Sequence, residues 1–449
     1  MRRGWPFMKS IIIGSNSSGG GKTTFTLGLM KALKNRKITV QGYKVGPDYI
    51  DPAFHKEVTG VPSRNLDVHL MGDDGVKYSY SRGKGQVGII EGVMGLYDGI
   101  GAGEEASTYH ISKILDNMPV ILVITPKGQS ATICAVIKGI KDYRNANVVG
   151  VVLNSVSEKY YKLLKYSIEN NCNTKVFGYI PKNDEISLES RHLGLVQSME
   201  IINLQHKLDI CGQMIEKYVD VDAILDSMKE FDIKEDKYYK NKLELENKGF
   251  RIGIPLDKAF NFYYRDNIEL LEELGEVIYF SPIKDKKIPE ELDFLYIGGG
   301  YPEVFKKELE DNESMRKSIR DALNNGLRCY AECGGLMYLT KEIDGNKMVG
   351  FFEGKSFMTK RLQRFGYCSI NIDKEYTDKQ IKINAHEFHK SDVEIKEKTI
   401  YKVEKHQYDG EIINWNCGYL KNNTLAGYAH INFLGNIDFL KRLVQYDDR

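Results

Sequence analysis

A loop of glycine and serine stands between a run of isoleucines and a lysine–threonine pair that opens an apolar, helix-like segment. This order is typical of a phosphate-binding loop, because glycines let backbone N–H groups face phosphate oxygens and the helix N-terminus adds partial positive charge. Lys22 would neutralise the β- and γ-phosphates, and Thr23 would offer its hydroxyl to Mg²⁺. The predicted ATP-binding residues are Ser18, Gly19, Gly20, Gly21, Lys22, Thr23 and Thr24.

The loop departs from the common phosphate-binding pattern at one position. That pattern has a glycine five residues before Gly21, where this chain has Asn16. The remainder resembles the deviant loop of MinD and dethiobiotin synthetase, with Ser18 where a signature lysine often stands. A plain glycine-rich turn is the alternative, and the Lys22–Thr23 pair in register after a strand argues against it.

Carboxylates follow two other predicted strands of the same region. Asp48 comes after the run 39–44, and Glu91 ends the run 87–91. Because the carboxyl ends of parallel strands meet at one edge of a sheet, these side chains are expected to lie close together. Mg²⁺ prefers carboxylate and hydroxyl oxygens, so the predicted metal ligands are Thr23, Asp48 and Glu91.

Further residues of these loops are predicted to bind the substrate or to organise the loop. They are Tyr49, Ile50, Asp51 and Asp98. Any single acid among the carboxylates could instead cap a helix or a turn. Lys44 either joins the substrate-facing set or pairs with an acid.

A cysteine at a predicted strand–turn–helix junction suggests nucleophilic chemistry in the second half of the chain. Small residues after Cys333 allow the sharp bend that exposes a nucleophile, and a helix N-terminus lowers the pKa of a thiol. Cys329 lies inside the predicted strand and is expected to be a small core residue. A zinc site on this pair is disfavoured because two further ligands would be needed.

The predicted cysteine site also needs an oxyanion hole and a base. The glycines that follow the predicted strand 294–297 could supply N–H groups together with the amide after Cys333, which gives the oxyanion set Gly299, Gly300 and Gly334. His430, His386 and His389 are the candidate bases, and spacing alone does not choose among them.

The order of apolar runs predicts an α/β fold with two domains. Residues 8–231 are expected to form a P-loop domain around a doubly wound, mostly parallel sheet, and 201–231 look helical. The charged stretch 232–249 predicts a linker, and 250–449 predict a second α/β domain. The predicted strands are 11–13, 39–44, 87–91, 120–125, 148–154, 176–180, 251–255, 277–280, 294–297 and 327–331, with a final helix at 437–444.

Composition narrows the class of protein. A net charge of +1 gives no reason to expect nucleic acid or a membrane surface as partner, and no apolar run approaches the ~20 residues of a membrane span. Seven cysteines, an odd number, indicate a reducing cytoplasm rather than a disulfide framework. The segment 4–7 is too short for a signal-peptide core, Met8 is an alternative start, and a homodimer is left open.

An ordered set of motifs between about residues 9 and 436 resembles the cobyrinic acid a,c-diamide synthase family. The motifs are GSNSSGGGKTT, YKVGPDYIDPAFH, NLD, IIEGVMGLYDG, SRHLGL, IGGGYPE, YAECGGLMYL, HEFH and GYAHINF. The resemblance implies an ATP-dependent amidoligase domain, similar to dethiobiotin synthetase, fused to a class I-type glutamine amidotransferase domain.

The resemblance also implies a reaction with two sites. Cys333, activated by His430, would release ammonia from L-glutamine, while ATP and Mg²⁺ would phosphorylate an acetate carboxylate of a cobyrinate-type tetrapyrrole. Type I amidotransferases place an acid two residues after that histidine, but this chain has Asn432 there, which leaves open what orients His430. Nickel-sirohydrochlorin and hydrogenobyrinate are alternative substrates, and a MinD/ParA-like switch ATPase is the alternative from another class.

Overall fold

The structure is a computed structural model that describes residues 7–186, 190–191, 194–195, 201, 203–232, 243, 245–372 and 380–445. The chain forms two compact units, Met1–Val68 with Gly72–Asn241 and His69–Met71 with Lys242–Arg449. Most of the predicted linker 232–249 and part of the SRHLGL motif lie outside the described residues. No helix in the described part of the chain is long and apolar enough to cross a membrane.

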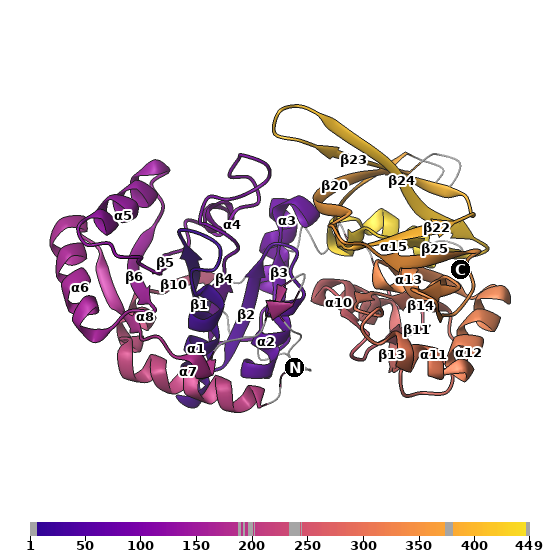
Figure 1. Ribbon diagram of the computed structural model, residues 1–449, viewed down its shortest axis with the longest axis horizontal. Coiled ribbons are helices and arrows are strands. Elements are labelled where there is room, and N and C mark those ends of the chain that lie inside the picture. The colour runs from indigo at the N-terminus through magenta and orange to yellow at the C-terminus, as the bar shows by residue number, and fades with distance from the viewer. Residues whose placement is uncertain are drawn as a thin grey trace. The chain divides into compact units, whose positions relative to one another are not determined.

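A largely parallel sheet forms the centre of the first unit (Figure 1). The strand order is β3-β2-β4-β1-β5-β6-β7, and β10 pairs antiparallel with β1. The strands are β1 (Phe7–Ser15), β2 (Val40–Val45), β3 (Arg64–Leu66), β4 (Val87–Glu91), β5 (Val120–Ile124), β6 (Val148–Asn154), β7 (Lys175–Ile180) and β10 (Lys229–Asp232). The chain order reverses at β1, and open α/β sheets bind ligands beside the carboxyl ends of strands at such a point.

Helices cover both faces of this sheet. Ile11 and Ile13 of β1 pack into a core with residues of α1, α2 and α7, while Ile12, which points to the opposite face, is equally buried. Burial on both faces explains why these strands lack a polar alternation. The helices are α1 (Lys22–Asn35), α2 (Ile50–Thr59), α3 (Val68–Ser81), α4 (Thr108–Ile114), α5 (Thr132–Tyr143), α6 (Glu158–Cys172), α7 (Leu204–Tyr218) and α8 (Val221–Ser227).

One element of the first unit differs from its prediction. The stretch 201–231 was expected to be helical throughout, and this is wrong at its end, where Lys229–Asp232 forms β10. Its main chain pairs with β1, from Phe7 opposite Asp232 to Ser10 opposite Lys229. The long-range pairing decides the structure, because the segment has neither an apolar face nor a strand-like alternation.

A ten-stranded mixed sheet organises the second unit. Its order is β13-β11-β14-β16-β25-β24-β23-β20-β21-β26, parallel from β13 to β25 and antiparallel beyond. The strands are β11 (Phe250–Pro255), β13 (Gly275–Phe280), β14 (Phe294–Ile297), β16 (Arg328–Glu332), β20 (Arg364–Ile372), β21 (Ile381–His389), β23 (Thr399–His406), β24 (Ile412–Lys421), β25 (Thr424–Gly427) and β26 (His430–Ile431). The parallel half matches the predicted strand–helix alternation.

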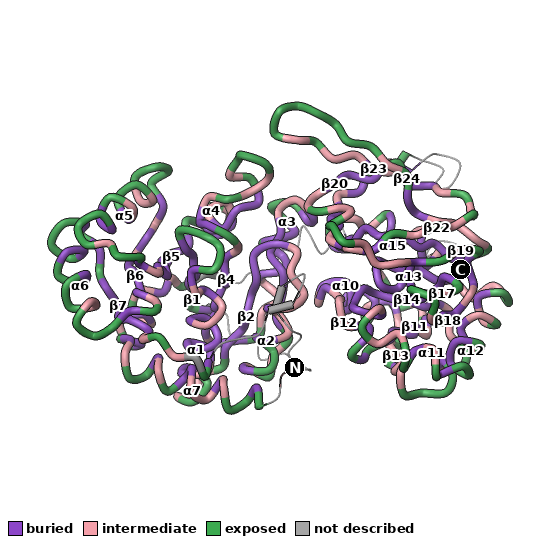
Figure 2. The backbone as a smooth tube through the Cα atoms, in the orientation of Figure 1, coloured by how far each residue is buried: buried purple, intermediate pink, exposed green. Residues whose placement is uncertain are grey.

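Smaller elements complete the second unit. The strands of this set are β12 (Phe260–Phe262), β15 (Gly299–Gly300), β17 (Glu342–Ile343), β18 (Asn346–Lys347), β19 (Gly354–Met358) and β22 (Ser391–Ile395). The helices are α10 (Arg265–Leu274), α11 (Lys306–Asp311), α12 (Glu313–Asn324), α13 (Gly334–Leu339) and α15 (Ile437–Val444), the last as predicted. The inner parallel strands β11, β14, β16 and β25 are largely buried, whereas the edge strand β13 is partly exposed and the turn between β23 and β24 is exposed (Figure 2).

Candidate active sites

The glycine loop follows β1 and ends at the first residue of α1. Gly21 precedes the helix with φ 89°, a left-handed conformation that favours glycine, and a Cβ there would lie 2.3 Å from Asn154 Nδ2. The Gly20 carbonyl accepts a hydrogen bond from Thr125 Oγ1 at 3.1 Å. Thr125 follows β5 and Asn154 ends β6, and the two side chains are hydrogen-bonded to each other. Residues at the ends of two neighbouring strands therefore hold the loop in place.

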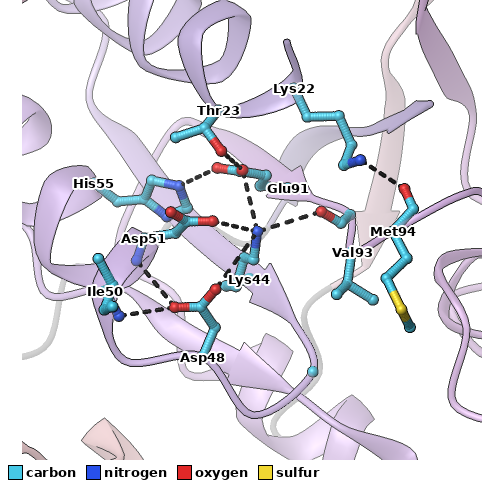
Figure 3. A network of polar contacts seen from close by, with 12 residues as sticks. Lys22, Thr23, Lys44, Asp48, Ile50, Asp51, His55, Glu91, Val93 and Met94 are labelled. Atoms are coloured by element: carbon cyan, nitrogen blue, oxygen red, sulfur yellow. Dashed lines mark hydrogen bonds and ion pairs between the residues drawn. The ribbon is translucent and has the colours of Figure 1, made fainter. Parts of the chain in front are cut away.

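Lys22 is folded back onto the loop that precedes it. Its Nζ donates to the Ser17 carbonyl at 3.1 Å. It also donates to the Met94 carbonyl at 2.6 Å (Figure 3). Burial, together with the positive charge of Lys44, lowers the pKa of Lys22 to about 8. The hydrogen bonds of this buried ammonium go to carbonyl oxygens, so an arriving phosphate would give it a negatively charged partner in direct contact.

Three carboxylates surround the ammonium of Lys44. Nζ lies 2.5 Å from Asp51 Oδ2, 3.1 Å from Glu91 Oε1 and 3.9 Å from Asp48 Oδ2 (Figure 3). Burial by itself lowers the pKa of Lys44, but Asp51 and Glu91 raise it above its usual range, so this side chain stays charged. Burial and the neighbouring carboxylates raise the pKa of Asp51 well above normal. Lys44 therefore pairs with acids.

Glu91 links the phosphate loop to this cluster. Its Oε1 accepts a hydrogen bond from Thr23 Oγ1 at 2.5 Å, and its Oε2 lies 2.8 Å from His55 Nε2. Burial by itself raises the pKa of Glu91, but Lys44 and His55 hold it well below its usual range. The carboxylate is fully buried. It is ionised because Thr23, Lys44 and His55 all donate hydrogen bonds to it.

The structure brings the predicted metal ligands together and gives several of the other predicted residues local roles. Asp48 Oδ1 accepts from the backbone N–H groups of Ile50 and Asp51 at 2.8 and 3.1 Å, so one of its oxygens caps α2. Asp98 Oδ2 accepts from the Gly95 N–H at 2.8 Å and organises its loop. Tyr49 directly precedes α2.

Cys333 lies at the sharp turn between β16 and α13. Its φ of 49° and ψ of −104° are strained for a residue with a side chain, as expected of a nucleophile elbow. Burial, with the charge of Glu303, raises the pKa of the thiol above its usual range. The thiol is therefore protonated in the free protein and needs a base. Cys329 is buried within β16, as predicted.

Glycines let the predicted oxyanion loop approach the cysteine turn. A Cβ on Gly334 would lie 3.1 Å from Gly300 N and 2.8 Å from Pro302 Cδ, so the two backbones meet closely. Gly299 and Gly300 form β15, which pairs with β12. A Cβ on Gly299 would lie 2.6 Å from His430 Cε1. Gly299 thus lies against His430, and Gly300 lies against the residue that follows Cys333.

His430 lies beside a carboxylate that the sequence analysis did not identify. Its Nδ1 is 3.6 Å from Glu332 Oε2, and Glu332 directly precedes Cys333. Both side chains are buried. The contact depends on strand pairing between residues far apart in the chain, and the only local signal is an acid immediately before the nucleophile.

The other polar residues near His430 have separate partners. Asn432 Oδ1 accepts from the Leu434 N–H at 3.0 Å and caps a short turn. The ring of His386 lies 5.2 Å from that of His430, and burial lowers the pKa of His386 well below its usual range. His389 stacks on Tyr428 with ring centroids 3.8 Å apart.

A pocket of the second unit carries charges of both signs. Arg364 and Glu387 line it together with Trp415 and Tyr428. Glu387 is buried, and its Oε1 accepts from Trp415 Nε1 at 3.3 Å. Tyr428 follows Gly427, whose carbonyl accepts a hydrogen bond from the Cys333 N–H at 2.8 Å. The negative charge of Glu387 also contributes to the raised pKa of the Cys333 thiol. The pocket is thus close to the nucleophile.

Two family models match the two halves of the chain. Residues 11–196 match the CobQ/CobB/MinD/ParA nucleotide binding domain, and residues 251–437 match the CobB/CobQ-like glutamine amidotransferase domain. The first match contains the glycine loop with Glu91, and the second contains Cys333 with His430. These matches confirm the predicted fold class of a P-loop domain followed by an amidotransferase domain.

Curated relatives are similar along the whole chain, and those named here are each called cobyrinate a,c-diamide synthase. The protein of Clostridium acetobutylicum is 59% identical over 443 residues, and that of Clostridium tetani 57% over 444 residues, each match covering 98% of this chain and 100% of the relative. The protein of Listeria innocua is 44% identical, covering 97% and 99%. The chain therefore belongs to the cobyrinate a,c-diamide synthase family.

Proposed function

We infer that this chain converts the a and c acetate carboxylates of cobyrinate into amides in cobalamin biosynthesis, with ATP and glutamine as co-substrates. The observation that carries this inference is the full-length identity with cobyrinate a,c-diamide synthases. Two chemically distinct sites support it, one built to hold phosphate and the other to attack an amide. A switch ATPase would have no use for the second.

The cysteine site would release ammonia from glutamine. His430 takes the proton of the Cys333 thiol, and the sulfur attacks the side-chain amide carbon. N–H groups of Gly299, Gly300 and Gly334 would stabilise the resulting oxyanion. The carbon–nitrogen bond then breaks, ammonia leaves with a proton from His430, and water hydrolyses the glutamyl thioester to glutamate.

The charged pocket near Cys333 suits the amino-acid end of glutamine. A free amino acid carries an ammonium and a carboxylate, and Glu387 and Arg364 offer one charge for each. Arg364 Nε is buried without a hydrogen-bond partner, so an incoming carboxylate would satisfy it. We propose that this pair selects free glutamine.

The phosphate loop would activate the substrate carboxylate. A carboxylate is a poor acyl donor at neutral pH, and transfer of the γ-phosphoryl group converts it into an acyl phosphate that ammonia can attack, with phosphate leaving. Lys22 would stabilise the negative charge on the transferred group. Lys44 keeps Glu91 ionised within the protein. Tyr49, Ile50, Asp51 and Asp98 are the residues proposed to face or shape the substrate site.

The oxygen atoms next to the phosphate loop are suitable ligands for Mg²⁺. Hydroxyl and carboxylate oxygens of Thr23, Asp48 and Glu91 come from three elements and are the hard ligands that this ion prefers. When bound, the ion would neutralise charge on the phosphate oxygens. No set of three or more acidic, histidine or cysteine side chains in the described part of the chain is arranged to hold a metal. Nucleotide oxygens would therefore have to complete the site.

The substrate is tested by supplying three tetrapyrroles separately with ATP and glutamine. Cobyrinate should give two successive mass decreases, each equal to replacement of OH by NH₂, while nickel-sirohydrochlorin and hydrogenobyrinate should stay unchanged. If nickel-sirohydrochlorin or hydrogenobyrinate is amidated and cobyrinate is not, the proposed substrate is wrong. The seven cysteines are all free and buried, which fits the reducing cytoplasm in which we propose that the enzyme works.

A further inference from the structure

A buried carboxylate stands beside the base of the cysteine site. Glu332 Oε2 is 3.6 Å from His430 Nδ1, and the exposed fractions of the two side chains are 1% and 3%. Since water is excluded from both, the charge of the carboxylate acts on the imidazole with little screening. Asn432, at the position where a type I amidotransferase carries its acid, is neutral and is occupied as a cap.

Two donors fix the carboxylate of Glu332 in place. Tyr296 Oη donates to Oε2 at 3.0 Å, and the Ile431 N–H donates to Oε1 at 3.0 Å. Burial and the adjacent Glu332 raise the pKa of Tyr296 well above its usual range, so the phenol keeps its proton and remains a donor. Donors on both oxygens favour the ionised form of the carboxylate.

The strand that carries His430 is held equally firmly. Asn267 Nδ2 donates to the Ile431 carbonyl at 2.8 Å, and Asn267 Oδ1 accepts from the Phe433 N–H at 2.7 Å. β26 also pairs with β21, which sets His430 opposite His386. The ring of His386 lies 5.2 Å from that of His430, and burial lowers the pKa of His386 well below its usual range, so this neighbour is neutral.

We propose that Glu332 is the positioning residue that orients His430 for glutamine hydrolysis. With Nδ1–H directed at the carboxylate, Nε2 carries the lone pair that accepts the Cys333 proton as the sulfur–carbon bond forms. The imidazolium then gives that proton to the departing nitrogen as the carbon–nitrogen bond breaks. Glu332 stays ionised throughout and stabilises the imidazolium. This role rests on the proposed glutaminase half-reaction.

The test replaces Glu332 by glutamine, which keeps the shape but removes the charge. In the full-length enzyme, Glu332→Gln should lower the glutamine-dependent kcat by roughly 10²- to 10⁴-fold, with little change in the KM for glutamine. Turnover with ammonium salts should remain at the wild-type rate. Glu332→Asp should recover part of the loss, and Tyr296→Phe, which removes one donor only, should lower kcat less than Glu332→Gln does.

A pH profile separates orientation from a merely structural role. Without the negative neighbour, the imidazolium is less favoured, so the acidic limb of glutamine-dependent kcat/KM should move to lower pH in Glu332→Gln. Glu310→Gln is the matched control, because Glu310 likewise accepts from a backbone N–H and a side chain, those of Lys347 and Asn346. It should leave both the rate and the pH profile unchanged.

Several results would overturn the assignment. These are a wild-type glutamine-dependent kcat in Glu332→Gln, an equal loss with ammonium, or a Glu332→Asp variant no better than the glutamine variant. Failure of the wild-type enzyme with either nitrogen source on every tetrapyrrole would instead count against the proposed function, so the two failures are distinguishable.

Discussion

His55 Nε2 lies 2.8 Å from Glu91 Oε2, and neither side chain has exposed surface. Because Glu91 is ionised, Nε2 donates to it, and Nδ1 is hydrogen-bonded to Ser63 Oγ at 3.0 Å. His55 therefore fixes the carboxylate that also contacts Thr23. We expect His55→Asn to lower amidation by about 10- to 100-fold with either nitrogen source, the usual effect of losing such a supporting partner.

The control for this histidine is an exposed one. His206→Asn, on the surface of α7, should have no effect on the rate. Glutamine hydrolysis measured alone should survive in His55→Asn, because its residues belong to the second unit. An equal loss of glutamine hydrolysis would mean that His55 supports the fold rather than the phosphate site.

Cys333→Ser tests whether the two sites divide the reaction. A serine hydroxyl is a far weaker nucleophile than the cysteine sulfur, so glutamine-dependent amidation should fall by at least about 10³-fold. Amidation with ammonium salts should continue, because ammonia then bypasses the cysteine. The measurement is the rate of product formation with each nitrogen source, and loss of both would contradict the division.

The sequence predicted those parts of the sites that depend on local order. Lys22 and Thr23 stand at fixed positions after a glycine loop, and Cys333 stands at a strand–helix turn, so neighbours in the chain reveal them. The predicted strands are present in the structure for the same reason, because a short run of apolar, β-branched residues is typical of a strand buried in a parallel sheet. The β10 segment is different, because only its pairing with β1 makes it a strand.

The supporting residues could not be predicted because distant segments bring them to their partners. Glu332 looks like the end of a buried strand until the pairing of β16 with β25 sets it opposite Gly427, three residues before His430. His55 lies one helical turn after Asp51, which places both on one face of α2, yet its partner Glu91 comes from another strand. Composition and spacing carry no information about such contacts.

Gly299 leaves the space in which His430 stands. A Cβ at this position would lie 2.6 Å from His430 Cε1, closer than carbon atoms approach each other, so Gly299→Ala should displace the imidazole. We expect glutamine-dependent turnover to fall by about 10²-fold, as a small misplacement of a reacting group can cause. Ammonium-dependent turnover, measured in parallel, should be unaffected.

The control for Gly299→Ala is a glycine at which an added methyl group would contact no other atom. Gly139 lies within α5, and a Cβ there meets no atom within 4 Å. Gly139→Ala should therefore leave both activities unchanged and raise the free energy of unfolding by about 0.4–1 kcal/mol. A Gly299→Ala enzyme with full glutamine-dependent activity would show that His430 tolerates displacement.

The lowered pKa of Lys22 predicts how ATP binding depends on pH. Burial and Lys44 bring this pKa to about 8, and a bound triphosphate favours the charged form. Below that pH the side chain is already charged, whereas above it binding must take up a proton. The apparent Kd should therefore be flat on the acidic side and rise above pH 8, by up to about tenfold per pH unit.

A titration of wild-type enzyme with a non-hydrolysable ATP analogue between about pH 7 and 9.5 measures this dependence. Lys22→Arg should bind more weakly because the planar guanidinium does not fit the lysine's place, but it should lose the rise in Kd above pH 8, since arginine keeps its charge throughout. Lys22→Ala should abolish amidation with both nitrogen sources. A rise of equal size in Lys22→Arg would assign the titration to another group, whereas its disappearance there would identify Lys22 as the residue that meets the phosphates.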